Sequence, residues 1–318
     1  MARSLALADA LVGLGAAVTV TFPDGAPRGE AARHLARLGI AETPIPADAV
    51  VVADLPQADE ATALASPERL VVLDDRDAFS GSAAIVVQPS QPEWSGRGRP
   101  GRVLAGYEWM AIASRYRELR EPARIRPDAV PEIVLCFGGS DPARVTERIG
   151  PVVAERARAE GWVLEAIVGA GHLGADDLPG LPLVRDPGDL PERLARADVV
   201  VVGAGIMKFE AACLGRPAVL VGVSDDQLPV GPVFASTGAA VWVGDGRTMD
   251  PSLAADAISA LVADPERRRA LGERGAAVVD GRGADRLADA ILALATATAT
   301  AGASTEAVRH RSGGERNA

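Results

Sequence analysis

The stretch VLCFGGSDPARVTERI, residues 134–149, carries the strongest local signal for chemistry in this chain of 318 residues. A strand-like apolar run is followed by two glycines, and Asp141-Pro142 then has the composition of a helix start. Glycines let an anion approach backbone amides, and a helix N-terminus adds partial positive charge. Because the Asp141 carboxylate would repel an anion, we expect a phosphate beside Gly138–Ser140, with Asp141 turned toward its own helix. The same stretch also fits an ordinary strand-to-helix turn.

A second strand-to-glycine junction occurs in ADVVVVGAGIMKFEAACLGRPAVLV, residues 197–221. Lys208 follows in the first turn of the expected helix, where the helix dipole disfavours a cation, so this lysine is explained if it faces a bound anion. A solvated lysine is the alternative. Glu210, two residues later, is able to accept hydrogen bonds from a ribose diol, although acidic residues are also favoured at helix starts.

A third stretch, VSDDQLPVGPVFASTGAAVWVG, residues 223–244, places two aspartates and Gln227 directly after a strand. In open parallel sheets, ligands bind outside the carboxyl ends of the strands. Polar strand ends near residues 138, 204 and 226 are therefore expected to converge on one edge of a single sheet.

A dinucleotide-binding alternative rests on Gly203-x-Gly205 after a strand, with Asp225 about 20 residues further on. That arrangement would suit an NAD-dependent oxidoreductase. However, Lys208 stands at the third glycine position of this fingerprint, and the motif lies deep in the second half of the chain. Both departures count against a nicotinamide cofactor.

Strand-like and helical runs alternate through the chain, which is typical of an α/β fold. Near-continuous valine runs indicate strands buried on both faces, as in a parallel sheet covered by helices. Two segments have helical spacing, residues 3–13 and 27–38. The predicted strands cover residues 16–22, 49–53, 69–75, 84–88, 132–139, 164–171, 198–205, 218–223 and 240–244.

The length of the chain favours two domains. Residues 115–131 are charged and proline-punctuated, so they are expected to connect the two halves. We predict an N-terminal Rossmann-like domain over residues 1–122 and a C-terminal one over residues 123–297. The segment 298–318 has no core-forming pattern and is predicted to be a disordered tail.

The net charge of −10 and the aromatic content of 3% argue against a nucleic-acid partner, although backbone amides are able to hold a small anion. No run approaches the roughly 20 apolar residues of a membrane-spanning helix. Asp9 interrupts the apolar opening MARSLALADAL, so a signal peptide is not expected and a cytoplasmic location is. Cys136 and Cys213 suit buried positions in a reducing compartment.

Three further polar residues have weaker signals. Asp74 and Asp75 end a strand in the first half, where they either face a ligand or cap the following turn. His172, in VGAGH, has no partner in view and is interpreted as incidental. Because the three histidines are scattered along the sequence, no histidine-based metal cluster is expected.

A series of segments then follow one another in a recognisable order: RSLALADAL, LDD, CFGGSDP, DLPERLARADVVVVGAG, KFEAACLGRPAVL, DDQ and DPERRRALGERGAAVVDGRGADRLADAIL. In these segments, which span residues 1–297, the chain resembles the nucleotide-sugar enzymes of the GT-B fold. The resemblance is closest to the UDP-sugar hydrolase of pseudaminic acid biosynthesis and to the SpsG spore-coat-polysaccharide proteins. MurG-type glycosyltransferases are more distant.

This resemblance implies two Rossmann-like domains whose parallel sheets face across a cleft, with UDP held by the second domain. The glycine loops and nearby amides would meet the diphosphate, Glu210 the ribose, and Gln227 the sugar or a phosphate. No metal and no cofactor are expected, because amides and helix dipoles neutralise the diphosphate of the nucleotide-sugar substrate. The residues expected at the nucleotide are Gly138, Gly139, Ser140, Ala204, Gly205, Ile206, Lys208, Glu210 and Gln227.

The expected chemistry is cleavage of the sugar–diphosphonucleoside linkage, with transfer to an acceptor or to water. A nucleotide-sugar-binding module that has lost catalysis is the alternative from a different class. In the family, the first strand leads into a glycine-rich loop ending in a histidine, and an arginine follows three residues later. Arg3 fits that arginine, so the first strand and the histidine, the general base of the hydrolase relatives, would precede Met1. We therefore hypothesise that the natural chain begins upstream, with Arg3 and Asp75 supporting the absent base.

Overall fold

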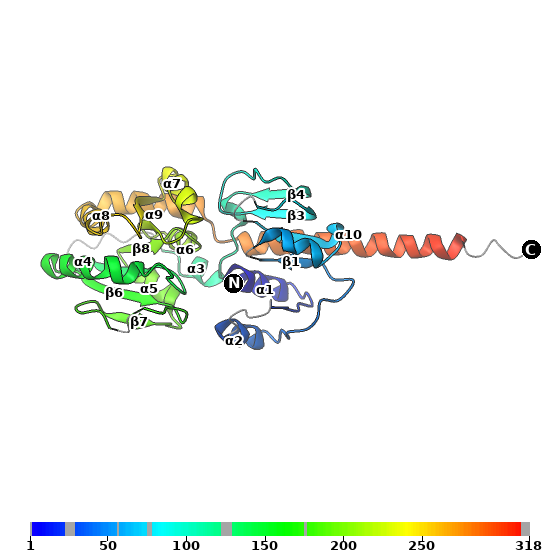
Figure 1. The fold of residues 1–318 in the computed structure, drawn as a ribbon, viewed down its shortest axis with the longest axis horizontal. Helices are drawn as coiled ribbons and strands as arrows, with labels where there is room; N and C mark the ends of the chain where they lie inside the picture. Colours follow the sequence, from blue (N-terminus) through cyan, green and yellow to red (C-terminus); the bar gives the residue numbers. More distant parts are fainter. Residues whose placement is uncertain are drawn as a thin grey trace, which may run out of the picture. The chain divides into compact units, whose positions relative to one another are not determined.

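The computed structural model describes residues 2–22, 29–55, 57–74, 78–121, 129–174 and 177–312. The chain divides into two compact units (Figure 1). Unit 1 contains residues 1–111 and 282–318, and unit 2 contains residues 112–281. The two boundaries therefore differ from those expected at residues 122 and 297.

Unit 2 is built on a six-stranded sheet in which all strands are parallel, in the order β10-β9-β8-β5-β6-β7. The first strand of the unit, β5, thus pairs with the second, β6, on one side and with the fourth, β8, on the other. This is the doubly wound order in which the chain reverses direction across the sheet at one switch point. The bounds of the strands are Glu132–Cys136 (β5), Val163–Val168 (β6), Leu183–Arg185 (β7), Val199–Gly203 (β8), Ala218–Gly222 (β9) and Ala240–Asp245 (β10).

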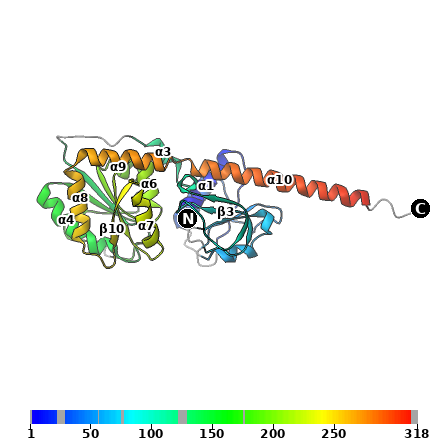
Figure 2. The same ribbon diagram turned by 90° about the horizontal axis from the view of Figure 1, so that it is seen from above.

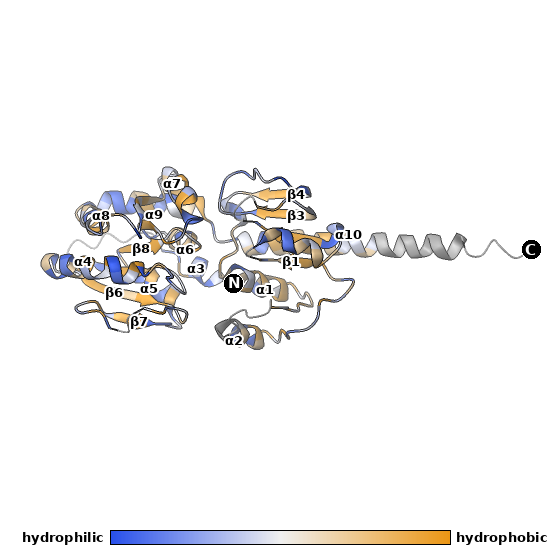
Figure 3. Cartoon of the chain, viewed as in Figure 1, coloured by the Kyte–Doolittle hydropathy of each residue, from blue (hydrophilic) through white to orange (hydrophobic). Residues whose placement is uncertain are grey.

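Helices cover both faces of this sheet, with α4 and α8 on one side and α6 and α7 on the other (Figure 2). The valine-rich strands are buried for that reason, and Figure 3 colours the strands as hydrophobic. One core cluster joins β5, β8 and β9 to α4 and α8 through residues such as Leu135, Val201 and Ile258. The helices of unit 2 are Ser114–Glu118 (α3), Val145–Glu160 (α4), Leu190–Arg196 (α5), Met207–Cys213 (α6), Gln227–Ser236 (α7), Ser252–Val262 (α8) and Pro265–Val278 (α9).

Unit 1 contains a four-stranded parallel sheet in the order β1-β2-β3-β4. Its strands are Val51–Ala53 (β1), Leu70–Leu73 (β2), Ser82–Gln88 (β3) and Arg99–Ala105 (β4). Its helices are Ala2–Gly13 (α1), Gly29–Arg37 (α2) and Gly283–Ser312 (α10), with short 3-10 turns at Ala58–Ala63 (η1), Pro67–Arg69 (η2) and Tyr107–Trp109 (η3).

The boundary near residue 282 is set by α10, which packs on α1 (Figure 1). Leu287 and Ile291 share a buried cluster with Leu7 and Leu11. Helix α10 continues to Ser312, so the predicted disordered tail over 298–318 is wrong as far as residue 312. The alternating Ala and Thr residues near position 298 have low sequence complexity. They nevertheless extend α10, because its preceding apolar turns are already packed on α1.

Most predicted strands are confirmed, within a few residues at each end, and so are the two predicted helices. The strand expected at residues 16–22 is wrong: in the described part of that segment, Val20 makes only an isolated parallel bridge to Glu42. A β-branched run becomes a strand only where a neighbour completes its hydrogen-bond ladder. Strands β4 and β7 were missed, because Arg, Pro and Gly interrupt the first and the second is three residues long.

Both cysteines are buried and unpaired, as expected. Within the described residues, no helix combines the length and the apolar character needed to cross a membrane.

Arg3 at the start of α1 forms a buried ion pair with Asp54, which follows β1. Its Nη2 donates to Asp54 Oδ1 at 2.6 Å and its Nε donates to the same oxygen at 3.1 Å, while Ser4 Oγ donates to Oδ2. Burial raises the pKa of Asp54, but the hydrogen bond and charge of Arg3 outweigh burial and lower it to about 2. This pair fixes the first turn of α1 to the end of β1.

Asp54→Asn is expected to destabilise the protein at neutral pH by about 3–5 kcal/mol, because the largely buried Arg3 guanidinium loses the opposite charge of Asp54. In the wild type, the lowered pKa of Asp54 contributes about 2 kcal/mol that is present above pH 4 and lost as the pH falls toward 2. Thermal unfolding between pH 7 and pH 2 measures both effects. Asp256→Asn, in the exposed ion pair with Arg156, is the control and should cost at most about 1 kcal/mol. Equal losses for the two variants would contradict the assignment.

Candidate functional site

Three strand ends of unit 2 meet at the switch point between β5 and β8, as the sequence predicts. A Cβ added at Gly203, the last residue of β8, would lie 3.4 Å from the carbonyl oxygen of Phe137 after β5. It would lie 3.6 Å from Oε1 of Gln227, which begins α7 after β9. The carboxyl ends of β5, β8 and β9 therefore form one edge, at the place where doubly wound sheets bind ligands.

The first glycine loop follows β5. Gly138 has a φ of +98°, a conformation that side chains with a Cβ disfavour. The loop packs closely against the segment after β6: a Cβ at Gly169 would lie 2.5 Å from Cα of Gly139, and the Gly171 amide donates to the Gly139 carbonyl at 3.1 Å. Gly139 and Ser140 are exposed. The loop is thus held from behind, with Gly139 and Ser140 at the surface.

Asp141 is buried and is turned toward its own helix, as predicted. Its carboxylate accepts the amides of Val145 at 2.9 Å and Thr146 at 2.8 Å, and the Thr146 hydroxyl at 2.7 Å. Helix α4 begins at Val145, so the expectation that Pro142 opens the helix is wrong. Residues 141–144 form a turn instead, with Arg144 in the left-handed region. The Asp141 carboxylate thus forms its hydrogen bonds with the start of its own helix, as we expected, and not with Gly138–Ser140.

The second glycine loop, Ala204–Ile206, is held by a buried lysine. Lys208 is only 1% exposed, which rules out the solvated alternative. Its Nζ donates to the carbonyls of Ala204 at 2.7 Å and Gly205 at 3.3 Å, and it lies 4.3 Å from the centre of the Phe209 ring. The lysine therefore binds the loop itself from the inside.

The position of this ammonium decides which way the loop's amides point. In a planar trans peptide the C=O and N–H are antiparallel. Since Lys208 draws the carbonyls of Ala204 and Gly205 toward itself, the amides of Gly205 and Ile206 point away from it. Two adjacent amides aimed outward form the kind of concavity that binds anions. These are two of the three amides that the family resemblance assigns to the diphosphate. The third assignment is wrong, because the Ala204 amide donates to the Val221 carbonyl at 2.9 Å as part of the sheet.

Glu210, in the first turn of α6, is buried, and its carboxyl group has a raised pKa. Burial raises its pKa to about 7, and the hydrogen bond from the Tyr116 hydroxyl offsets this only partly. Burial and the neighbouring Glu210 charge raise the pKa of Tyr116 well above its usual range. A carboxylate with one neutral donor in an apolar setting is able to accept further hydrogen bonds from a diol.

Gln227 reaches back to the second glycine loop. Its Oε1 accepts the amide of Val223 at 3.3 Å, and a Cβ at Gly205 would lie 3.1 Å from its Nε2. The nearby Asp225 is exposed and paired with Arg247 at 2.6 Å.

The dinucleotide-binding fingerprint belongs after the first strand of such a fold. Here Gly203-x-Gly205 follows the fourth strand, which argues further against that alternative.

Of the two catalytic candidates in unit 1, only Arg3 lies within the described residues. Arg3 is bound to Asp54, and Asp75 lies outside the described residues. Asp74 caps the turn after β2, since its carboxylate accepts the amides of Ala78 and Phe79 at 3.0 and 2.9 Å. A role of Arg3 toward a substrate stays a prediction.

Two side-chain contacts of unit 2 were not predicted from the sequence. Tyr116 lies in the segment expected to connect the domains, and only its being one of two tyrosines marks it out. His172 is buried beside Glu147 rather than incidental in an exposed loop. Both contacts join residues distant in sequence, which no local pattern reveals.

Glu210→Gln is expected to raise the stability of the free protein at pH 8 but not at pH 4.5. The raised pKa means that the folded state holds its proton more tightly than the unfolded state, so stability falls as the pH rises from 4.5 through 7. The glutamine removes this fall, worth about 3 kcal/mol at most. Melting temperatures across this range provide the measurement, with Glu273→Gln, at an exposed position on α9, as the control. A pH-independent difference between Glu210→Gln and wild type would refute the assignment.

Comparisons with known proteins show similarity in sequence and in fold. No protein-family model matches the chain. SpsG, the spore coat polysaccharide biosynthesis protein of Bacillus subtilis, is 22% identical over 193 residues, covering 58% of this chain and 57% of SpsG. The UDP-N-acetylglucosamine–N-acetylmuramyl-(pentapeptide) pyrophosphoryl-undecaprenol N-acetylglucosamine transferase of Rhodopseudomonas palustris is 33% identical over 188 residues, covering 53% of this chain and 48% of the transferase.

The chain spans about half the length of the curated relatives it matches. Among solved structures, the crystal structure of MurG from Acinetobacter baumannii superimposes with a TM-score of 0.58 at 17% identity, over 91% of this chain and 95% of that one. The predicted fold, α/β with two Rossmann-like domains of the GT-B type, is confirmed. The chain is a GT-B-fold protein related in sequence to SpsG and to the MurG-type glycosyltransferases.

Proposed function

We propose that this protein binds a nucleotide sugar, in the first place a UDP-sugar, at the switch point of unit 2 and cleaves the sugar–diphosphonucleoside linkage. The observation that carries the proposal is the meeting of two glycine loops, Gly138–Ser140 and Ala204–Ile206, beside the buried Glu210. The sequence relatives support the UDP-sugar class, since one of them is by name a UDP-N-acetylglucosamine transferase.

Each part of the nucleotide has a matching group in this arrangement. The diphosphate would accept hydrogen bonds from outward-facing amides of the two loops, which stay free of the Asp141 charge because that carboxylate caps α4. The ribose diol would donate to Glu210. Gln227, next to Gly205, would contact the sugar or a phosphate. These groups bind the diphosphate without a metal ion.

The reaction would replace the bond from the sugar's anomeric carbon to the diphosphate oxygen by a bond to an incoming oxygen. Water as nucleophile gives a free sugar, and an acceptor hydroxyl gives a glycoside. In both cases UDP leaves with the electron pair of the broken bond, and a general base takes the proton of the nucleophile. The amides that bind the diphosphate also stabilise the charge of the leaving UDP.

Glu210→Ala is expected to weaken the binding of UDP at least tenfold, because the ribose loses a charge-assisted hydrogen-bond acceptor. Isothermal titration of the purified chain with UDP measures this. Glu273→Ala on α9 is the matched control and should bind like the wild type. Unchanged affinity in Glu210→Ala would exclude the ribose assignment.

A panel of UDP-sugars, incubated with and without candidate acceptors, tests the chemistry. Release of UDP that depends on an acceptor indicates a transferase, and release in water alone indicates a hydrolase. If the protein binds UDP but releases none from any UDP-sugar, the second candidate function, a nucleotide-sugar-binding module, is favoured over an enzyme. That candidate is favoured by the pairing of Arg3 with Asp54, which occupies one expected catalytic group.

A further inference from the structure

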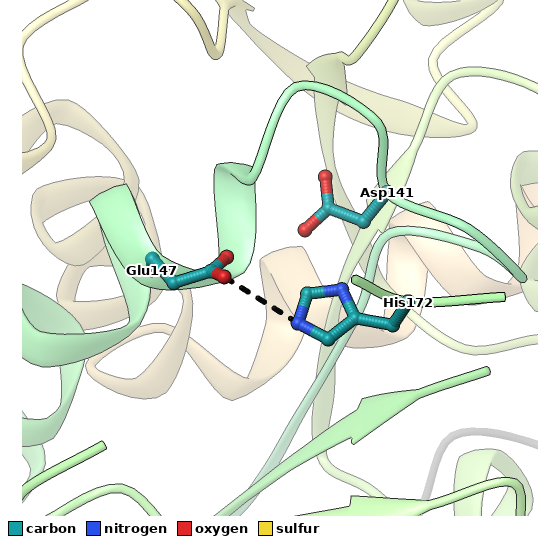
Figure 4. A group of neighbouring side chains, drawn as sticks. All are labelled: Asp141, Glu147 and His172. Carbon is teal, nitrogen blue, oxygen red and sulfur yellow. Dashed lines mark ion pairs between the residues drawn. The ribbon is translucent and has the colours of Figure 1, made fainter. Parts of the chain in front are cut away.

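Three side chains with metal-binding atoms come together behind the first glycine loop (Figure 4). Asp141 comes from the turn before α4, Glu147 from the first turn of α4, and His172 from the segment after β6. One donor atom from each lies within 4.8 Å of the other two. None of these three side chains is among the groups that we propose to contact the nucleotide.

His172 is the unexplained member of this cluster. Its side chain is 1% exposed, and among the residues that the structure describes neither Nδ1 nor Nε2 has a hydrogen-bond partner. A buried polar group without a partner costs about 1–3 kcal/mol, so an imidazole with two such atoms requires an explanation. Figure 4 shows the ring facing the carboxylates of Glu147 and Asp141.

The spacing of the donors matches ligands of one cation better than a hydrogen bond. His172 Nε2 lies 3.5 Å from Glu147 Oε1, beyond the usual range for a hydrogen bond. Two ligands each about 2.0–2.1 Å from a tetrahedral zinc ion lie roughly 3.4 Å apart. The Asp141 donor lies within 4.8 Å of the other two, so it needs to approach by at most about 1.4 Å to complete the set.

The surroundings resemble the outer shell of a metal site. The Asp141 carboxylate accepts three hydrogen bonds from Val145 and Thr146, one at Oδ1 and two at Oδ2, which orient it while leaving one lone pair of Oδ1 free. Gly174 leaves room for the other two ligands, because a Cβ there would lie 1.6 Å from Glu147 Oε1 and 2.4 Å from His172 Nε2.

We propose that Asp141, Glu147 and His172 bind a divalent transition-metal ion, with zinc as the best fit to one imidazole and two carboxylates. A water molecule would complete the tetrahedron. The ion would join the segment after β6 to the turn before α4, and so brace the first glycine loop from behind. The role is structural and separate from the diphosphate.

Titration of the metal-free full-length chain with Zn²⁺, and with Co²⁺ as a spectroscopic probe, tests this proposal. We expect one ion per chain, a rise in melting temperature, and cobalt absorption typical of a four-coordinate site. His172→Ala should weaken zinc binding roughly a hundredfold or more, since losing a ligand costs more than losing an outer-shell partner. Gly174→Ala should also weaken it without removing a ligand.

His34→Ala is the matched control, because His34 pairs with one carboxylate, that of Asp9, within the part of the chain that the structure describes. It should bind zinc like the wild type. A wild-type chain that binds no zinc would overturn the proposal. Equal affinity in wild type and His172→Ala would overturn it as well.

Discussion

The site depends on one constraint of the backbone: parallel strands buried on both faces present their carboxyl ends at a common edge. In unit 2 the strand order reverses between β5 and β8, so the loops that follow these strands leave toward opposite faces of the sheet. The gap between them is lined by main chain, which is why glycines occupy both loops. Glu210 and Gln227 are placed there by the helices that follow β8 and β9.

Buried charges hold the two loops in place. Lys208 binds the carbonyls of Ala204 and Gly205 from the core side, and Asp141 binds the amides at the start of α4. Each charge is satisfied by the backbone, so neither competes with a ligand at the outer surface. Lys208 and Asp141 thus orient the peptide groups of their own segments.

The first glycine loop has an exposed side and a supported side. Gly139 and Ser140 are exposed, while Gly169 and Gly171 press against Gly139 from behind. His172 follows at once on that inner side. A binding loop of glycines is intrinsically mobile because glycine restricts the backbone least, so bracing from the neighbouring segment lowers the entropy lost when a ligand binds.

The sequence by itself determined the α/β class, the parallel sheet, the polar strand ends and the inward turn of Asp141, because each follows from local periodicity or from the chemistry of adjacent residues. Only the tertiary structure decided that Lys208 faces its own loop, that Tyr116 donates to Glu210, that His172 meets Glu147, and that α10 belongs to unit 1. Those outcomes depend on which surfaces pack together across distant parts of the chain. Hydrophobic periodicity identifies the buried face of a helix or strand, but it does not identify the element that packs against that face.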